Sequence, residues 1–259
     1  MYKKIYCFLL CSVVFLNCSK PCIAQSSSTN VTSFKVLEDS LMLFDKNRDR
    51  QIPVALYFPQ TTKKLKNQPL VIVSHGYWQN KGGSNKAYTS IAKKLATHGY
   101  FVASIQHELP NDDLIPTTGI PQIVRRPFWE RGSDNILFVL NELKKTQSYL
   151  DFKHVVLIGH SNGGDMSILF AHKHPDLVDK VISLDSRRMP FPRTAQPKLY
   201  SLRSSDQVAD EGVLPSIEEQ KKYGITIIKL NNTIHNDMDD NANEAQRKEI
   251  NDYIMRFLK

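Results

Sequence analysis

One serine of this sequence stands where it can act as a nucleophile. Ser161 lies in the segment 159–164, Gly-His-Ser-Asn-Gly-Gly, which follows the apolar run 155–158 and precedes a helical pattern. A Gly-x-Ser-x-Gly turn between a strand and a helix exposes the serine hydroxyl, and the helix behind it presents N–H groups to a developing anion. We therefore predict that Ser161 is the nucleophile of an acyl-transfer reaction.

A serine becomes a strong nucleophile only when a base accepts its proton, and an acid must hold that base in the correct tautomer. His235 lies in the loop after the last predicted strand, residues 225–230, where the base follows the nucleophile and the acid in chain order. His172 and His174 lie on or at the end of the helix directly behind Ser161, and we expect them at the surface. We predict that His235 is the base.

Two aspartates compete for the role of the acid. Asp206 follows the predicted strand 199–202 and is the first choice. Asp185 ends the preceding predicted strand, 181–184, and could reach the same imidazole from a neighbouring position. Asp210 is a third, less favoured candidate. The aspartate that is not the acid is expected to order a loop.

The tetrahedral intermediate of acyl transfer needs two hydrogen-bond donors for its oxyanion. The N–H of Asn162, the residue after the nucleophile, is the first predicted donor. The second is the N–H of Tyr77, in the turn 74–77 that follows the apolar run 70–73.

The elements that position these residues alternate between strands and helices. Strands are predicted at 36–44, 51–58, 70–73, 100–105, 155–158, 181–184, 199–202 and 225–230, and helices at 87–97, 134–145, 163–172, 216–223 and 243–258. The first two strands read as a hairpin. The later strand-helix units predict an α/β fold with a mostly parallel sheet and helices on both faces, because parallel neighbours need crossover connections.

With these residues in hand, the chain resembles an α/β-hydrolase from residue 36 onward. It is similar to the group that contains predicted dienelactone hydrolases, platelet-activating-factor acetylhydrolases and cutinase-like polyester hydrolases. The resemblance rests on four segments: Ser-His-Gly at 74–76, residues 98–103, Arg131 with 134–140, and the segment 159–164.

The resemblance implies a fold and an ester-cleaving activity, but it leaves the acid open. Acetylhydrolases place the acid after the strand corresponding to 181–184, whereas cutinase-like enzymes place it after the next strand. This chain has Asp185 at the first position and Asp206 at the second. True dienelactone hydrolases use a cysteine nucleophile, and no cysteine follows Cys22.

A long insertion at residues 106–132 is expected to line or overhang the cleft. It contains four prolines and the arginines Arg125, Arg126 and Arg131. These arginines either meet an acidic substrate or pack the loop onto the sheet, and the sequence does not decide between the two.

The N-terminus has the pattern of an export signal. Lys3 and Lys4 precede a 12-residue apolar core, and small residues precede a cleavage point after Ala24. We predict a signal peptide at 1–24, a flexible tether at 25–30, a catalytic domain at 31–259 and a periplasmic or secreted protein. Lipid attachment at Cys18 is the less favoured alternative, and a transmembrane anchor needs a longer apolar run.

Composition excludes several other classes. The 259 residues are 41% hydrophobic and 23% charged, as in a soluble globular protein. The formal charge of +8 comes from scattered Lys and Arg without a recognition motif, so we expect no nucleic-acid partner. We expect no cofactor and no metal, since all four cysteines precede residue 23.

The sequence therefore predicts an exported serine hydrolase that cleaves carboxylic esters of small molecules, lipids or polymers through Ser161, His235 and Asp206, with Asp185 as the alternative acid. An amidase or peptidase with the same triad is the first alternative. A non-catalytic binding protein of the same fold is the second.

Overall fold

The computed structural model describes residues 1–2, 33–62 and 65–259. Apart from Met1 and Tyr2, the predicted signal peptide 1–24 and the tether 25–30 lie outside the described residues. In the part of the chain that is described, no helix combines the length and the apolar character needed to cross a membrane.

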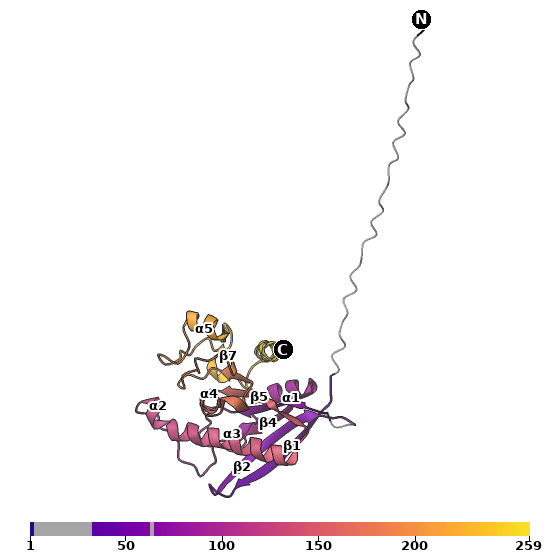
Figure 1. The fold of residues 1–259 in the computed structure, drawn as a ribbon. Helices are drawn as coiled ribbons and strands as arrows, with labels where there is room; N and C mark the ends of the chain where they lie inside the picture. Colours follow the sequence, from indigo (N-terminus) through magenta and orange to yellow (C-terminus); the bar gives the residue numbers. More distant parts are fainter. Residues whose placement is uncertain (3–32, 63–64) are drawn as a thin grey trace. The chain divides into compact units, whose positions relative to one another are not determined.

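One eight-stranded sheet organises the fold, in the order β1-β2-β4-β3-β5-β6-β7-β8 (Figure 1). The strands are β1 (Val36–Asp45), β2 (Arg50–Pro59), β3 (Gln68–Ser74), β4 (Phe101–Ile105), β5 (Leu150–His160), β6 (Lys180–Leu184), β7 (Lys198–Arg203) and β8 (Thr226–Lys229). β1 and β2 form the predicted antiparallel hairpin, β2 pairs antiparallel with β4, and every later pairing is parallel. The predicted fold class is confirmed.

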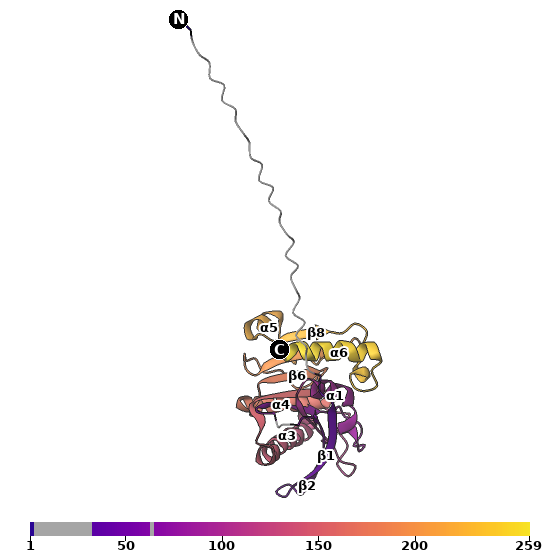
Figure 2. The same ribbon diagram turned by 90° about the vertical axis from the view of Figure 1, so that its right-hand side faces the viewer.

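Helices cover both faces of the sheet. They are α1 (Thr89–Thr97), α2 (Pro121–Val124), α3 (Arg126–Thr146), α4 (Asn162–Lys173), α5 (Ile217–Tyr223) and α6 (Glu244–Phe257). One buried cluster joins α3 and α4 to one face, and a second joins α1 and α6 to the other. Figure 2 shows α6 running along the sheet near β8 and β6.

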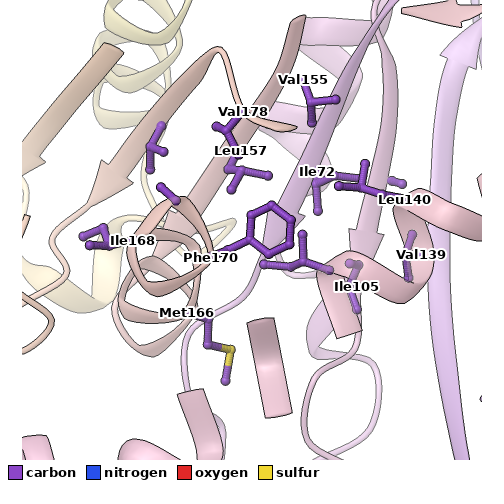
Figure 3. Close-up of a cluster of buried hydrophobic side chains, with 14 of the residues drawn as sticks. Ile72, Ile105, Val139, Leu140, Val155, Leu157, Met166, Ile168, Phe170 and Val178 are labelled. Carbon is purple, nitrogen blue, oxygen red and sulfur yellow. The ribbon is translucent and has the colours of Figure 1, made fainter. Parts of the chain in front are cut away.

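The core between α3, α4 and the sheet holds α4, the helix that follows Ser161, in place. Met166 and Phe170 of α4 are fully buried against side chains of α3 and of the central strands. Figure 3 shows Phe170 beside Leu157 and Ile72, with Val139 on the neighbouring helix. Burial of a large apolar side chain stabilises the fold by about 1.5–3 kcal/mol, so this packing fixes the position of α4.

Helix α3 begins eight residues before the predicted start at residue 134. Ser133, the residue just before the predicted start, is buried inside the helix. The helix instead starts around Pro127, because a proline in the first turn lacks only an N–H that would have no intrahelical acceptor. The earlier start brings Trp129 into the buried face of α3.

Parallel strands end at the same edge of the sheet, and the predicted functional residues follow these ends. Tyr77 comes after β3, Ser161 after β5 and Asp185 after β6, while Asp206 comes after β7. The carboxyl edge of an open parallel sheet is where such folds bind ligands. The topology therefore gathers residues from four separate segments at one edge.

Candidate active site

Ser161 sits on a sharp turn between β5 and α4. Its backbone has φ 50° and ψ −118°, which lies outside the regions that non-glycine residues favour. A Cβ atom on Gly159 would overlap the backbone of Gly163, and one on Gly163 would overlap the carbonyl of Ser74. The two glycines therefore permit the close approach of strand and helix that the turn at Ser161 requires.

The serine hydroxyl is hydrogen-bonded to the imidazole of His235. Nε2 of His235 lies 2.9 Å from Oγ of Ser161, and Nδ1 lies 2.6 Å from Oδ2 of Asp185. An ionised carboxylate can only accept, so Nδ1 carries the proton and Nε2 is free to accept the proton of the hydroxyl. The structure thus brings the predicted nucleophile and the predicted base together, with Asp185 behind the base.

Asp185 is fully buried and its carboxylate contacts four groups. Besides His235, it accepts hydrogen bonds from the N–H and the hydroxyl of Ser204, at 3.1 and 2.7 Å, and forms an ion pair with Arg203 at 2.7 Å. Burial by itself raises the pKa of Asp185, but the bond from His235, the charge of Arg203 and the bonds from Ser204 hold the pKa below its ordinary value. The carboxylate therefore stays ionised beside the imidazole.

Asp206, the preferred acid in the sequence analysis, does not contact the imidazole ring. It is exposed, and its Oδ1 accepts the backbone N–H of His235 at 2.7 Å. The loop after β7 leads Asp206 past the ring to the backbone, whereas Asp185 follows β6 directly with a φ of 55°. The prediction of Asp206 as the ring partner is thus wrong, and the alternative Asp185 occupies that position.

A buried histidine and a buried tyrosine connect the His235 loop to the turn after β3. Nε2 of His160 donates to the carbonyl of His235 at 3.0 Å, so Nδ1 accepts the hydroxyl of Tyr88 at 2.6 Å. The tyrosine oxygen in turn accepts the N–H of Gly76 at 3.0 Å. Burial, together with the nearby His235, lowers the pKa of His160 to about 3, so this ring is neutral.

Sequence reasoning missed this connection, although His160 is the second residue of the Ser161 motif. Nothing in the sequence pairs His160 with Tyr88, because the two residues are 72 positions apart. Their contact exists only once α1 packs on the face of the sheet that carries the end of β5.

Of the two predicted oxyanion donors, Tyr77 lines the same cavity as Ser161, and Asn162 directly follows Ser161 in the chain. Asn162 is the first residue of α4, and N–H groups of a first helical turn have no intrahelical acceptor. The Asn162 side chain accepts the indole N–H of Trp129 at 2.8 Å and donates to Glu108 at 2.9 Å, which fixes the turn. Since Tyr88 occupies the N–H of Gly76, Tyr77 is the next residue of its turn that could donate.

A cavity of about 380 Å³ opens beside the serine. Its lining residues come from the turn after β3, the end of β5 and the loop after β8: Gly76, Tyr77, Trp78, Gln79, Lys81, His160, Ser161, His235, Asn236, Asp239 and Asn241. Trp78 and Tyr77 provide aromatic surface, and the remaining lining is polar. A small molecule can reach Ser161 through this opening.

No cluster of three or more His, Cys, Asp or Glu side chains suited to a metal ion occurs among the residues that the structure describes. The groups hydrogen-bonded in series at Ser161 are a hydroxyl, an imidazole and a carboxylate.

A sequence model of the α/β-hydrolase fold matches residues 69–217, which is more than half of the chain. The chain belongs to the α/β-hydrolase fold family. No curated protein sequence matches this α/β-hydrolase.

Several solved esterases have the same fold. A bacterial heroin esterase superposes with a TM-score of 0.61 at 13% identity, over 86% of this chain and 85% of that chain. Thermogutta terrifontis esterase 2, phosphoramylated by tabun, gives 0.64 at 11% identity over 85% and 93%. The hyperthermophilic esterase of the archaeon Pyrobaculum calidifontis gives 0.60 at 14% identity over 84% and 83%. At such identities the likeness concerns the fold.

Proposed function

We propose that this α/β-hydrolase is a serine esterase in which Ser161, His235 and Asp185 form the catalytic triad. The observation that carries the proposal is the chain of two hydrogen bonds from Oγ of Ser161 through His235 to Asp185 at a strand-turn-helix elbow. The esterase fold of the structural neighbours and the open cavity beside Ser161 support an ester as substrate.

In the proposed mechanism Oγ of Ser161 attacks the ester carbonyl while Nε2 of His235 takes the hydroxyl proton. The oxyanion of the tetrahedral intermediate accepts the N–H groups of Tyr77 and Asn162. The carbon–oxygen bond to the alcohol breaks as His235 returns its proton to the leaving oxygen. Water, deprotonated by His235, then attacks the acyl carbon, and the bond from that carbon to Oγ of Ser161 breaks as His235 returns the proton to Oγ and the acid is released. Asp185 keeps the imidazole in the tautomer that both proton transfers need.

Substitution of Ser161 tests the proposal. We expect Ser161→Ala to lose hydrolysis of p-nitrophenyl acetate and butyrate and to lose covalent labelling by a fluorophosphonate. Ser148→Ala is the matched control, because Ser148 is exposed and precedes the start of β5. Activity that persists in Ser161→Ala at the wild-type level would falsify the assignment of the nucleophile.

Within the family, the position of Asp185 favours an arrangement like that of the platelet-activating-factor acetylhydrolases. Asp185 follows β6 directly, which is the position that the resemblance assigns to the acid of that group. We include this subgroup in the proposal as the nearer of the two alternatives. If the enzyme hydrolyses short-chain and long-chain acyl esters of the same alcohol at comparable rates, that result would argue against this subgroup.

We also propose that the protein is exported and cleaved after Ala24. The support is the basic start, the apolar core and the small residues before the cut. Intact mass spectrometry of the protein recovered from the producing cell should give a chain that starts at Gln25. A chain with lipid at Cys18, or an uncleaved chain, would contradict this proposal.

A further inference from the structure

Three arginines near the triad lack the ion pairs that other arginines of the protein form. Among the described residues, six arginines pair with a carboxylate: Arg48, Arg50, Arg126, Arg131, Arg193 and Arg203. In that same part of the chain, Arg125, Arg187 and Arg188 form no ion pair, although each is half-buried. The insertion 106–132 thus supplies Arg125 unpaired, while Arg126 and Arg131 have partners within that insertion.

The three guanidinium groups lie close enough to repel one another. Burial lowers the pKa of Arg125 and of Arg187, and the charge of Arg188 lowers both further. The Nε atoms of Arg187 and Arg188 are buried and have no hydrogen-bond partner in the described structure. Buried donors without partners and like charges in contact both destabilise a fold unless an anion binds there. Arg187 has one side-chain acceptor, the amide oxygen of Gln207.

The backbone around these arginines is held firmly. The side-chain amide of Gln122 donates to the carbonyl of Arg188 at 3.3 Å and to the carboxylate of Asp210 at 3.1 Å. The N–H of Asp210 donates to the carbonyl of Arg187 at 2.9 Å. Asp165 accepts the N–H of Arg188 at 3.1 Å. The start of α3, the loop after β6 and α4 are therefore tied together at the arginines.

Hydrogen bonds connect the backbone of this arginine cluster to the turn that carries Ser161. Asp165, which anchors Arg188, donates its own N–H to the carbonyl of Ser161 at 3.0 Å and is one helical turn, about 6 Å, further along α4. Arg187 is two residues after Asp185, and its charge contributes to the lowered pKa of His160. None of the three arginines lines the cavity of about 380 Å³ beside Ser161, so a carboxylate that they bind belongs to a part of the substrate that extends beyond that cavity.

The acidic groups around the cluster do not neutralise it. Asp165 is buried, and desolvation raises its pKa to about 6, so part of its charge is lost in mildly acidic solution. Asp185 is paired with Arg203, so Asp165 and Asp210 are the two aspartates left to act on the three arginines. The three unpaired arginines thus exceed the acids that face them.

We propose that Arg125, Arg187 and Arg188 bind a carboxylate of the substrate, so that the enzyme prefers esters that carry a free carboxylate group. A guanidinium presents a planar fork of donors that matches a carboxylate, and charge-assisted bonds of this kind are about twice as strong as neutral ones. This inference rests on the proposed esterase function and names the substrate class of the same site.

Matched ester pairs test the proposal on the wild-type protein. Mono-p-nitrophenyl adipate is compared with p-nitrophenyl hexanoate for a carboxylate on the acyl side, and 4-acetoxybenzoate with its methyl ester for one on the alcohol side. The uncatalysed rate is subtracted for each. We expect a kcat/KM at least about tenfold higher for the carboxylate member of one pair, through a lower KM, and a decline of this ratio as NaCl is added.

Arginine variants then locate the preference. In Arg125→Gln and Arg188→Gln the ratio of carboxylate to neutral ester should fall about tenfold towards one. Arg126→Gln is the matched control, because Arg126 is the neighbour of Arg125 in the chain but has an exposed side chain that pairs with Glu130. This variant should keep the wild-type ratio. Thermal melting of each variant shows whether it is folded.

Several outcomes would overturn the proposal without touching the esterase function. A wild-type ratio near one in both pairs, or a ratio that is unchanged in Arg125→Gln and Arg188→Gln, would do so. A preference for 4-acetoxybenzenesulfonate without one for the carboxylate would contradict the assignment of a carboxylate. Absence of hydrolysis and of fluorophosphonate labelling at Ser161 would instead remove the esterase function, and this inference with it.

Discussion

Two buried carboxyl groups flank the first turn of α4, and their surroundings give them opposite character. Asp185, after β6, has a partner on each oxygen. Glu108, after β4, accepts one bond from Asn162, and its Oε2 has no hydrogen-bond partner in the described structure. Both are at most 1% exposed. The two carboxyl groups are thus buried to the same extent, but they differ in their hydrogen-bond and ionic partners.

The pKa values follow the partners. The pKa of Asp185 is held below its ordinary value, whereas desolvation raises the pKa of Glu108 to about 7 despite the charge of Arg131. His75 does not offset this burial, because its Nε2 is 3.7 Å from Glu108 and accepts the N–H of His107 instead. Two carboxyls at equal depth therefore differ in charge, and only the ionised one can stabilise an imidazolium.

The largest effect should come from Asp185→Asn. The amide cannot hold the imidazole in its working tautomer, so we expect kcat on p-nitrophenyl butyrate to fall by about four orders of magnitude. Loss of the partner of Arg203 should also lower the stability, which thermal melting reports. Residual activity within tenfold of wild type in a folded variant would show that the comparison assigns the wrong carboxyl.

Glu108→Gln should change the pH dependence of stability. A raised pKa means that the native state holds the proton more tightly than the unfolded chain does. Titration of Glu108 therefore removes roughly 3 kcal/mol of stability from the wild-type protein as the pH rises from about 4.5 to about 7, and the neutral amide of the variant makes no such contribution.

Urea denaturation of both proteins at several pH values measures this difference. The stability of Glu108→Gln relative to wild type should increase across that window and level off above it. The same titratable and charged side chains face position 108 in both proteins: His75, His107, Arg131 and Asp112. Their own titration therefore largely cancels in the difference in stability between the two proteins. Glu142→Gln, a control at a half-buried position on α3 that pairs with Lys145, should show no such trend. A constant difference across the window would mean that Glu108 is ionised like Asp185.

Tyr88→Phe should have a smaller effect on activity than Asp185→Asn, and it should disturb both the Tyr77 turn and the His235 loop. Removal of the hydroxyl leaves the buried N–H of Gly76 and Nδ1 of His160 without their partner, which should cost about 1–3 kcal/mol of stability. We also expect kcat to fall, since the same hydroxyl links the Tyr77 turn to the His235 loop. Tyr223→Phe on α5 serves as a control outside this network, because the Tyr223 ring contacts Lys222. Equal stability of the two variants would contradict the role of Tyr88.

The smallest effect should come from Asp206→Asn. The amide oxygen can still accept the N–H of His235, so we expect kcat to change by less than about tenfold. This variant is also the matched control for Asp185→Asn, because both remove one negative charge near His235. A loss as large as that of Asp185→Asn would restore Asp206 as the acid.

Local patterns determined much of this protein. Alternating apolar runs and helical segments predicted the sheet and its leading hairpin, because the core needs apolar residues at the period of each element. The turn around Ser161 identified the candidate nucleophile, since its glycines and its strand-helix setting are neighbours in sequence. His235 followed from its place after the last strand.

The identity of the acid, the unpaired arginines and the Tyr88–His160 contact were decided only by the tertiary structure. Asp185 and Asp206 both follow strands that end at the same sheet edge, so strand order cannot separate them. The path of two loops separates them: one carboxylate lies 2.6 Å from Nδ1 of His235, and the other lies 2.7 Å from its backbone nitrogen. Such distances depend on how distant segments pack, which no local pattern of residues encodes.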